Sequence, residues 1–353
     1  PELQDVTNIQ RISEDSFVQL LSYVLPSKWK GRGIVKWAPA DALLLADAPT
    51  GQPLPQHPTR EWLCSLWEYI SCCKNLSTFS AWPLVPTVDG MLCRLHPLSH
   101  LLSPDDCSPE MISLLTKVGC QCVDLSFSCK HKDIRKLVQA ATVSGILDTF
   151  QKISEESSQH VSVHFEDVDT LERVKLREFV CQRLFGQSKE VLKDEDVLCL
   201  RSLPIFELSV TNGTGKQSFS DLLGEQFIPP NDVDSKLLTS RFVKIVLEDD
   251  LKLYRFLDIK QMSGSDFYCK HVFNHLAEFD PAVRDKTMLQ MLQDLPTLSR
   301  SNPEFLGHLK KLAFVPSIDG SLHCASSLYD PSIPELCSLL DESRHFPGGA
   351  FAS

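Results

Sequence analysis

The sequence has no apolar run long enough to cross a membrane. A membrane-spanning helix needs about 20 consecutive apolar residues, and the longest apolar stretches here, such as residues 42–46, are far shorter. The first residues, Pro1 to Asp5, carry no initiator methionine, no basic start and no apolar signal core. We therefore expect no membrane partner, and we expect the chain to be a segment excised from a longer protein.

A concentration of positive charge is missing as well. The chain has 35 lysines and arginines against 46 aspartates and glutamates, a net charge of −11 with histidine neutral. Nucleic-acid-binding proteins usually carry a basic patch or stripe. Here the densest basic cluster is short and comprises Lys28, Lys30, Arg32 and Lys36. The charge pattern predicts that the chain binds no nucleic acid.

Motifs for catalysis or nucleotide binding are also absent. Neither Gly-x-Ser-x-Gly nor Gly-x-Gly-x-x-Gly occurs. Residues 212–217 resemble a phosphate-binding loop, but Val210 stands where its first glycine belongs, and Gln217 replaces the hydroxyl residue that binds magnesium. This pattern favours a plain turn. We predict that the chain is not an enzyme, and we assign it no cofactor and no catalytic, cofactor-binding or metal-binding residue.

The 13 cysteines do not form the pattern of a disulfide framework, because their number is odd and their spacing irregular. They indicate free thiols in a reducing cytoplasm. Cys120, Cys122, Cys129 and His131 place four possible zinc ligands in one short stretch. The two-residue spacing usual inside a ligand pair is missing. Apolar core cysteines are therefore favoured, and a zinc module remains an alternative.

Two histidine pairs have a spacing of four residues. His160 and His164 flank a valine-rich stretch that favours a strand, and no glutamate completes a zinc-protease motif between them. His271 and His275 lie on a predicted helix, where nothing in the sequence indicates a third ligand. We interpret His160 and His164 as an exposed or loosely placed pair, and His271 and His275 as ordinary partly buried histidines.

The tryptophans are concentrated in the first quarter of the chain, at Trp29, Trp37, Trp62, Trp67 and Trp82. Trp62 and Trp67 lie on one predicted helix and could form a binding face. Large aromatic side chains more often anchor a core, so core positions are favoured.

Two sequence motifs recur in the same order, which indicates an internal repeat. Val-Pro-Thr-Val-Asp-Gly at residues 85–90 returns as Val-Pro-Ser-Ile-Asp-Gly at residues 315–320. Pro-Glu-Met-Ile-Ser-Leu-Leu at residues 109–115 returns as Pro-Glu-Leu-Cys-Ser-Leu-Leu at residues 334–340. Asp-Gly between apolar runs predicts a hairpin turn, and Pro-Glu before an apolar run predicts a helix start. A looser third relative covers residues 203–208.

Apolar residues at helical spacing dominate the rest of the chain. The predicted helices span residues 15–25, 60–74, 133–152, 169–185, 267–279, 283–295 and 303–311. We predict an α+β fold, mainly helical, in which helices pack against small antiparallel hairpins and the unit is repeated. The acidic residues 193–196 mark the predicted boundary. It separates a first repeat unit with connecting helices, residues 1–195, from a second repeat unit, residues 196–353.

Several of these motifs together resemble the sacsin family and its plant relatives. They are Leu-Pro-Ile-Phe-Glu-Leu at residues 203–208, Trp-Pro-Leu-Val-Pro-Thr at residues 82–87 and Phe-Val-Pro-Ser-Ile-Asp-Gly at residues 314–320. The resemblance extends from about Phe17 to Leu340. It implies a large repetitive protein with Hsp90-like ATPase modules and a cytoplasmic role in chaperone or co-chaperone activity. The Asp-x-Gly-x-Gly element of such a module is absent, so the resemblance implies a segment downstream of one, with no ATP-site residue.

The leading prediction from this resemblance is a non-catalytic scaffold or client-binding segment for protein quality control. Apolar grooves or hairpin edges would hold partner segments. Its partners would be other domains of the same large chain and client or chaperone proteins. The alternatives are a purely structural spacer that positions ATPase modules, and an enzyme or zinc module with an unrecognised site.

Overall fold

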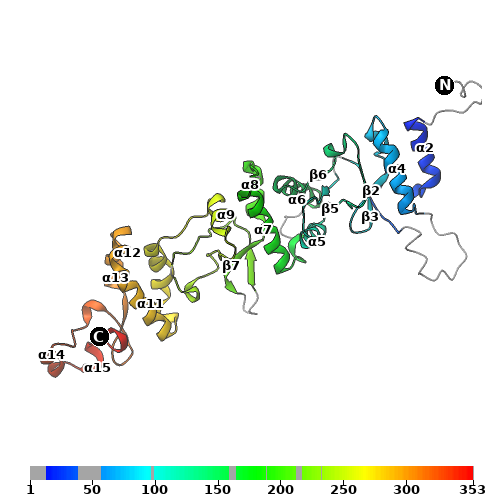
Figure 1. Ribbon diagram of the computed structural model, residues 1–353. Helices are drawn as coiled ribbons and strands as arrows, with labels where there is room; N and C mark the ends of the chain where they lie inside the picture. Colours follow the sequence, from blue (N-terminus) through cyan, green and yellow to red (C-terminus); the bar gives the residue numbers. More distant parts are fainter. Residues whose placement is uncertain are drawn as a thin grey trace, which may run out of the picture. The chain divides into compact units, whose positions relative to one another are not determined.

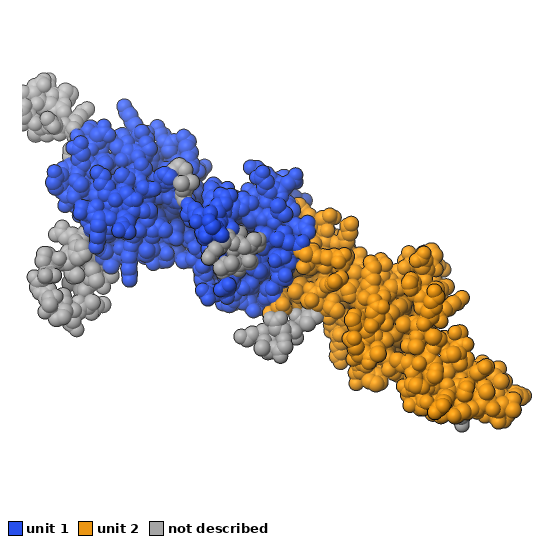
Figure 2. All heavy atoms as spheres, turned by 180° about the vertical axis from the view of Figure 1, so that it is seen from behind, with its two compact units in different colours: residues 1–206, 219–223 blue, residues 207–218, 224–353 orange. Residues whose placement is uncertain are grey.

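The computed structural model describes residues 13–38, 57–96, 99–158, 164–187, 189–211, 217–231 and 233–352. They form two compact units, one of residues 1–206 and 219–223, the other of residues 207–218 and 224–353 (Figure 2). The boundary predicted after residue 195 falls within helix α8 (Asp194–Ser202), because the acidic residues there form the first turn of a helix, where negative charge is favourable. The fold class is α+β, mainly helical with small hairpins (Figure 1).

The first half of unit 1 packs helices against a three-stranded antiparallel sheet of order β1-β3-β2. Its elements are α2 (Glu14–Val24), η1 (Ser27–Trp29), β1 (Ile34–Lys36), α4 (Arg60–Cys72), η2 (Leu76–Phe79), β2 (Pro83–Pro86) and β3 (Met91–Arg94). Side-chain oxygens of Ser13 and Thr59 cap α2 and α4, as Ser and Thr commonly do at helix starts. Trp67 donates from its indole nitrogen to the carbonyl of Leu84 at 2.8 Å, which ties α4 to the sheet.

The second half of unit 1 contains a small parallel sheet of order β5-β4-β6 and several helices. Its elements are β4 (Leu101–Ser103), α5 (Pro109–Val118), β5 (Gln121–Cys122), η3 (Ile134–Lys136), β6 (Gln139–Ala140), α6 (Val143–Ser157), α7 (Thr170–Phe185) and α8. The predicted helix over residues 133–152 is wrong in its first part. Gln139 and Ala140 pair with β4 instead, and Thr142 caps a helix that begins only at Val143.

Unit 2 is built mainly from short helices. Its elements are β7 (Phe206–Thr211), β8 (Gln217–Ser220), η5 (Ser235–Leu237), α9 (Asp250–Phe256), α10 (Gly264–Phe267), η6 (Tyr268–Val272), η7 (Phe273–Glu278), α11 (Pro281–Gln293), α12 (Leu295–Ser301), α13 (Phe305–Lys311), β9 (Ala313–Pro316), β10 (Leu322–Cys324), η8 (Ala325–Ser327), α14 (Pro334–Leu339), α15 (Glu342–His345) and η9 (Gly349–Phe351). The boundary between the units passes through the β7–β8 hairpin. The helix predicted over residues 267–279 is helical but changes from α to π to 3₁₀ geometry.

The two predicted hairpins, β2–β3 and β9–β10, have the same register. Each contains one bulge at the same place. The pairs are Pro83–Arg94, Val85–Cys93 and Pro86–Leu92 in the first hairpin, and Ala313–Cys324, Val315–His323 and Pro316–Leu322 in the second. Equivalent residues therefore differ in number by 230 across both strands. The two hairpins therefore share one backbone geometry.

The two turns are also built alike. In both, the backbone N–H of the glycine donates to the carbonyl of the buried hydroxyl residue, from Gly90 to Thr87 at 3.0 Å and from Gly320 to Ser317 at 2.9 Å. That residue also donates its hydroxyl to Asp89 or Asp319, respectively. Both glycines have positive φ, 75° and 84°, a conformation that other residues rarely adopt.

The equivalence continues beyond the segments that match in sequence. Asp124 donates its backbone N–H to the carbonyl of Pro86 at 2.9 Å, and Gly348 does the same to the carbonyl of Pro316 at 2.7 Å. Three residues later each segment has a phenylalanine, Phe127 and Phe351. Each unit thus closes the free edge of its first hairpin strand with a returning segment.

No helix in the described ranges has both the length and the apolar character to span a membrane.

Candidate functional site

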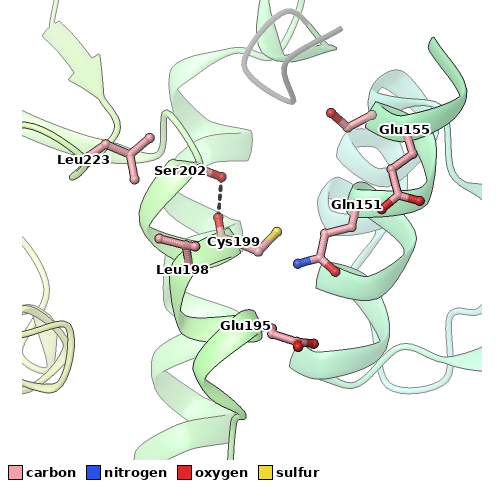
Figure 3. A pocket seen from close by; sticks show the side chains of 8 residues that line it. Gln151, Glu155, Glu195, Leu198, Cys199, Ser202 and Leu223 are labelled. Atoms are coloured by element: carbon pink, nitrogen blue, oxygen red, sulfur yellow. Dashed lines mark hydrogen bonds between the residues drawn. The ribbon is translucent and has the colours of Figure 1, made fainter. Parts of the chain in front are cut away.

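An open groove of about 590 Å³ lies between helices α6 and α8 of unit 1 (Figure 3). Two leucines, two glutamates and several smaller polar groups line it. The lining residues are Gln151, Ser154 and Glu155 from α6, Glu195, Leu198, Cys199 and Ser202 from α8, and Leu223. The groove therefore combines apolar surface with negative charge.

The helix pattern of α6 explains which side chains reach the groove. Its apolar residues Ile146, Phe150 and Ile153 are buried at a spacing of three to four residues. Gln151, Ser154 and Glu155 lie on the neighbouring stripe. The helix thus fixes its apolar stripe in the core and presents a polar one to the groove.

Two contacts hold α8 against α6. The hydroxyl of Ser144 donates to the carboxylate of Asp196 at 2.9 Å, and the same carboxylate accepts from the backbone N–H of Lys193 at 3.2 Å. The thiol of Cys199 points to the carbonyl of Leu147 at 3.8 Å. Polar contacts of Asp196 and Cys199 therefore help to fix the wall of the groove.

The leucines of the groove are unusually open to water. Leu198 is 61% exposed and Leu223 is 47% exposed. Leu198 follows Val197 in a helix whose buried residues are Asp196, Cys199 and Leu200. Adjacent exposed apolar side chains in a concave surface are typical of a binding site.

The chemistry of Cys199 does not suit a nucleophile. Burial, together with the charge of Asp196, raises the pKa of its thiol to about 11. Because the thiolate is the reactive form, this side chain stays protonated near neutral pH. The groove offers apolar contact and carboxylates rather than an activated group.

The four residues of the alternative zinc module are buried or partly buried. Cys120 and Cys122 flank Gln121 of β5 and are buried, and burial raises the pKa of the Cys122 and Cys129 thiols to about 12. Both ring nitrogens of His131 are engaged by the backbone: Nδ1 accepts from the N–H of Asp133 at 3.1 Å, and Nε2 lies 3.1 Å from the carbonyl of Cys73. Throughout the part of the chain that the structure describes, no three His, Cys, Asp or Glu side chains are grouped to hold a metal.

His271 and His275 have different surroundings. His271 is packed against the rings of Phe242 and Phe267 at 5.0 and 6.0 Å, whereas the exposed His275 pairs with Glu278. His160 lies outside the described residues, as do residues 212–216 of the glycine-containing stretch. His164 lies 3.2 Å from the hydroxyl of Ser157.

The tryptophans occupy the core of unit 1. Trp29, Trp37, Trp67 and Trp82 are buried, and Trp62 is partly buried against the same cluster. They therefore leave no exposed aromatic face on α4.

Comparison with known proteins yields one distant relative. The chain is similar to human sacsin. The two are 23% identical over 373 residues, which covers 98% of this chain and 8% of sacsin. No family model matches the chain, and no solved structure does. This likeness supports a relationship to sacsin over almost the whole chain.

The motif at residues 203–208, which the sequence shares with the sacsin family, is buried by α7. The guanidinium of Arg173 donates to the carbonyl of Pro204 at 2.5 Å, and that of Arg177 to the carbonyl of Ile205 at 3.2 Å. Phe206 and Glu207 are buried as well, and Glu207 accepts from Lys244. This part of the resemblance to sacsin therefore concerns residues that stabilise the fold.

The groove residues were not singled out by the sequence. Leu198 stands in the stretch Asp-Glu-Asp-Val-Leu-Cys-Leu-Arg-Ser, where a helical pattern alone does not say which of three apolar residues is exposed. The one available signal was an apolar residue next to three acids. Leu223 comes from a segment after β8, and hydrogen bonds between Leu222 and Arg201 hold that segment on α8.

Proposed function

We propose that this chain is a non-catalytic, client-binding segment of a large sacsin-like protein with a chaperone or co-chaperone role in the cytoplasm. The observation that carries the proposal is the open groove with two exposed leucines and two carboxylates. The similarity to sacsin over 98% of the chain supports the parent class. The raised pKa of Cys199 supports binding rather than covalent chemistry.

The groove suits a partner helix that is apolar on one side and basic at its margin. Leu198 and Leu223 would contact the apolar side, as in other helix-in-groove complexes. Glu155 and Glu195 would lie near lysine or arginine side chains of the partner. The attraction would steer association and weaken with added salt.

The first test is suppression of aggregation. A heat-denatured model client is followed by light scattering with and without the full chain, in the absence of ATP, with an inert protein of similar size and charge as the control. We expect suppression at near-stoichiometric ratio. Absence of suppression would contradict client binding and favour the structural spacer.

The second test assigns the activity to the groove. The double substitution Leu198→Gln with Leu223→Gln should reduce suppression several-fold while leaving the fold unchanged, because both side chains are largely exposed. Leu171→Gln is the matched control, since Leu171 is 57% exposed on helix α7 of the same unit and does not line the groove. Equal suppression by both variants would contradict the assignment.

A further inference from the structure

Strand β10 of unit 2 lacks the neighbour that its equivalent in unit 1 has. Strand β3 lies between β2 and β1, whereas among the described residues β10 pairs with β9 alone. The two hairpins agree in register, turn and bulge. The outer edge of β10 is therefore equivalent to the edge of β3 that pairs with β1.

The occupant in unit 1 is the segment around β1. Its residue pairs with β3 are Ile34–Cys93, Val35–Leu92 and Lys36–Met91. At its ends, the carbonyl of Gly33 accepts from the N–H of Arg94 at 2.9 Å, and the N–H of Trp37 donates to the carbonyl of Gly90 at 3.1 Å. The equivalent groups in unit 2 are the N–H of Cys324 and the carbonyl of Gly320.

Two apolar residues that β1 and the segment after it cover in unit 1 are less buried at the equivalent positions of unit 2. Leu92 is fully buried and Phe127 is 4% exposed, because β1 covers the first and the indole of Trp37 lies 5.6 Å from the ring of the second. Their equivalents Leu322 and Phe351 are only half-buried. An apolar strip next to unused backbone groups is typical of a strand that accepts another strand.

Charge at this edge favours one kind of residue. Lys36 pairs with Met91, and the equivalent of Met91 is Ser321. The hydroxyl and N–H of Ser321 both donate to Asp319, and hydrogen bonds from Ser317 and Ser321 hold the pKa of that carboxyl well below its usual range. A negative charge thus lies beside the position where a lysine would enter.

We propose that the free edge of β10 binds an extended segment of a partner protein as an antiparallel strand. The segment would have a β-branched residue opposite Leu322, a lysine next to it and a tryptophan one residue further that packs on Phe351. This inference rests on the proposed client-binding function and assigns a second binding mode to it, separate from the groove.

The probe is a labelled peptide with the sequence of residues 32–38, Arg-Gly-Ile-Val-Lys-Trp-Ala, and its partner is the full chain. Cys324→Pro removes the outward N–H. Cys324 has φ −69° and ψ 141°, so proline is accommodated without backbone strain. Cys324→Ser is the matched control, because it alters the same thiol and keeps the N–H. Circular dichroism checks that both variants fold.

We expect the wild-type chain and Cys324→Ser to bind the peptide equally, and Cys324→Pro to bind it at least tenfold more weakly. A peptide with alanine in place of tryptophan, or the variant Phe351→Ala, should also weaken binding. Equal binding to the proline variant, no measurable binding to wild type, or saturation explained by self-association in sedimentation would overturn the inference.

The aggregation assay keeps the two proposals separable. If Cys324→Pro abolishes peptide binding and the wild-type chain still suppresses aggregation through its leucines, both stand. If the peptide fails to bind while suppression persists, the edge inference falls alone. If the peptide binds but the chain protects no client from aggregation, the proposed client-binding function is wrong. The edge of β10 would then bind a strand of a folded partner protein.

Discussion

The hairpins β2–β3 and β9–β10 are the same structure placed in two different surroundings. Their turns, their registers and their bulges agree. Strand β3 has a neighbour on both sides, whereas β10 has one only on the side of β9 among the residues that the structure describes. The shared features are set by a few neighbouring residues. The difference comes from β1, whose residues lie more than fifty positions before their partners in β3, as in the pair Val35–Leu92. Local sequence therefore determines the hairpin, and distant segments determine how much of it is buried.

The helices that follow the hairpins repeat this contrast. Helix α5 buries Met111, Leu114, Leu115 and Val118, whereas none of the described side chains of α14 is buried, although both begin with Pro-Glu and share Ser-Leu-Leu. Helix α7 explains the difference. Its Glu172 accepts hydrogen bonds from Ser113 and Lys117 of α5 at 3.0 and 2.7 Å. The second helix has the same sequence signal without such a cover.

The largest expected effect comes from removing the cover of the first hairpin. Trp37→Ala deletes a buried indole that packs on Phe127 and donates to the carbonyl of Pro58 at 2.8 Å. We expect a loss of about 3–5 kcal/mol in the local stability of unit 1. Amide hydrogen exchange over residues 83–94 measures it.

The second hairpin is the internal control for this substitution. Exchange over residues 313–324 should stay unchanged, and Phe351→Ala should cost less than Trp37→Ala because Phe351 is less completely buried. A loss of protection in both hairpins after Trp37→Ala would mean that the two units do not unfold independently. It would contradict the use of the second hairpin as a control for the first.

A smaller effect is expected from the link between α5 and α7. Glu172→Gln removes the charge that binds Lys117 and weakens the capping box of α7, which should cost about 1–3 kcal/mol at neutral pH. Burial acts to raise the pKa of Glu172, but hydrogen bonds from Lys117, the Asp169 backbone and Ser113 outweigh it and lower the pKa. Urea denaturation at several pH values measures the difference.

The sign of the pH dependence follows from that lowered pKa. The ionised carboxylate contributes fully above the ordinary glutamate pKa of about 4.3, and its contribution is lost as the pH falls through the lower value in the folded state. Wild type and Glu172→Gln should therefore converge below about pH 4. Glu178→Gln in the same helix is the control. Its partly exposed pair with Lys175 should be worth at most about 1 kcal/mol at any pH, and an equal effect of both substitutions would contradict the argument.

Much of the fold follows from local signals in the sequence. The Asp-Gly turns, the Pro-Glu helix starts and the apolar spacing of residues 169–185 predicted elements that are present. The same approach failed at residues 133–142, where helical spacing was outweighed by the pairing of Gln139 and Ala140 with β4. Such pairing depends on a strand more than thirty residues away, and periodicity within one segment carries no information about it.

The candidate sites lay beyond prediction for the same reason. The groove needs Leu198 and Leu223 to be exposed together, and the open edge of β10 needs a strand to be absent beside it. Both depend on what covers a segment rather than on its own residues. For the cysteines the sequence favoured core positions, and Cys120 and Cys122 are indeed buried.

The smallest expected effect is a loss of stability that should be equal in the two hairpins. Gly90→Ala and Gly320→Ala each force a side chain into positive φ at a place where a Cβ would meet no atom within 4 Å. Only the conformational cost remains, about 1–2 kcal/mol, and it should be the same in both hairpins by amide hydrogen exchange. Gly307→Ala is the control, because Gly307 lies in helix α13 with open space around it, where alanine should stabilise by about 0.5–1 kcal/mol. Unequal costs at the two turns would show that β1 supports the turn as well as the edge, since it is the one strand that the first hairpin has and the second lacks among the described residues.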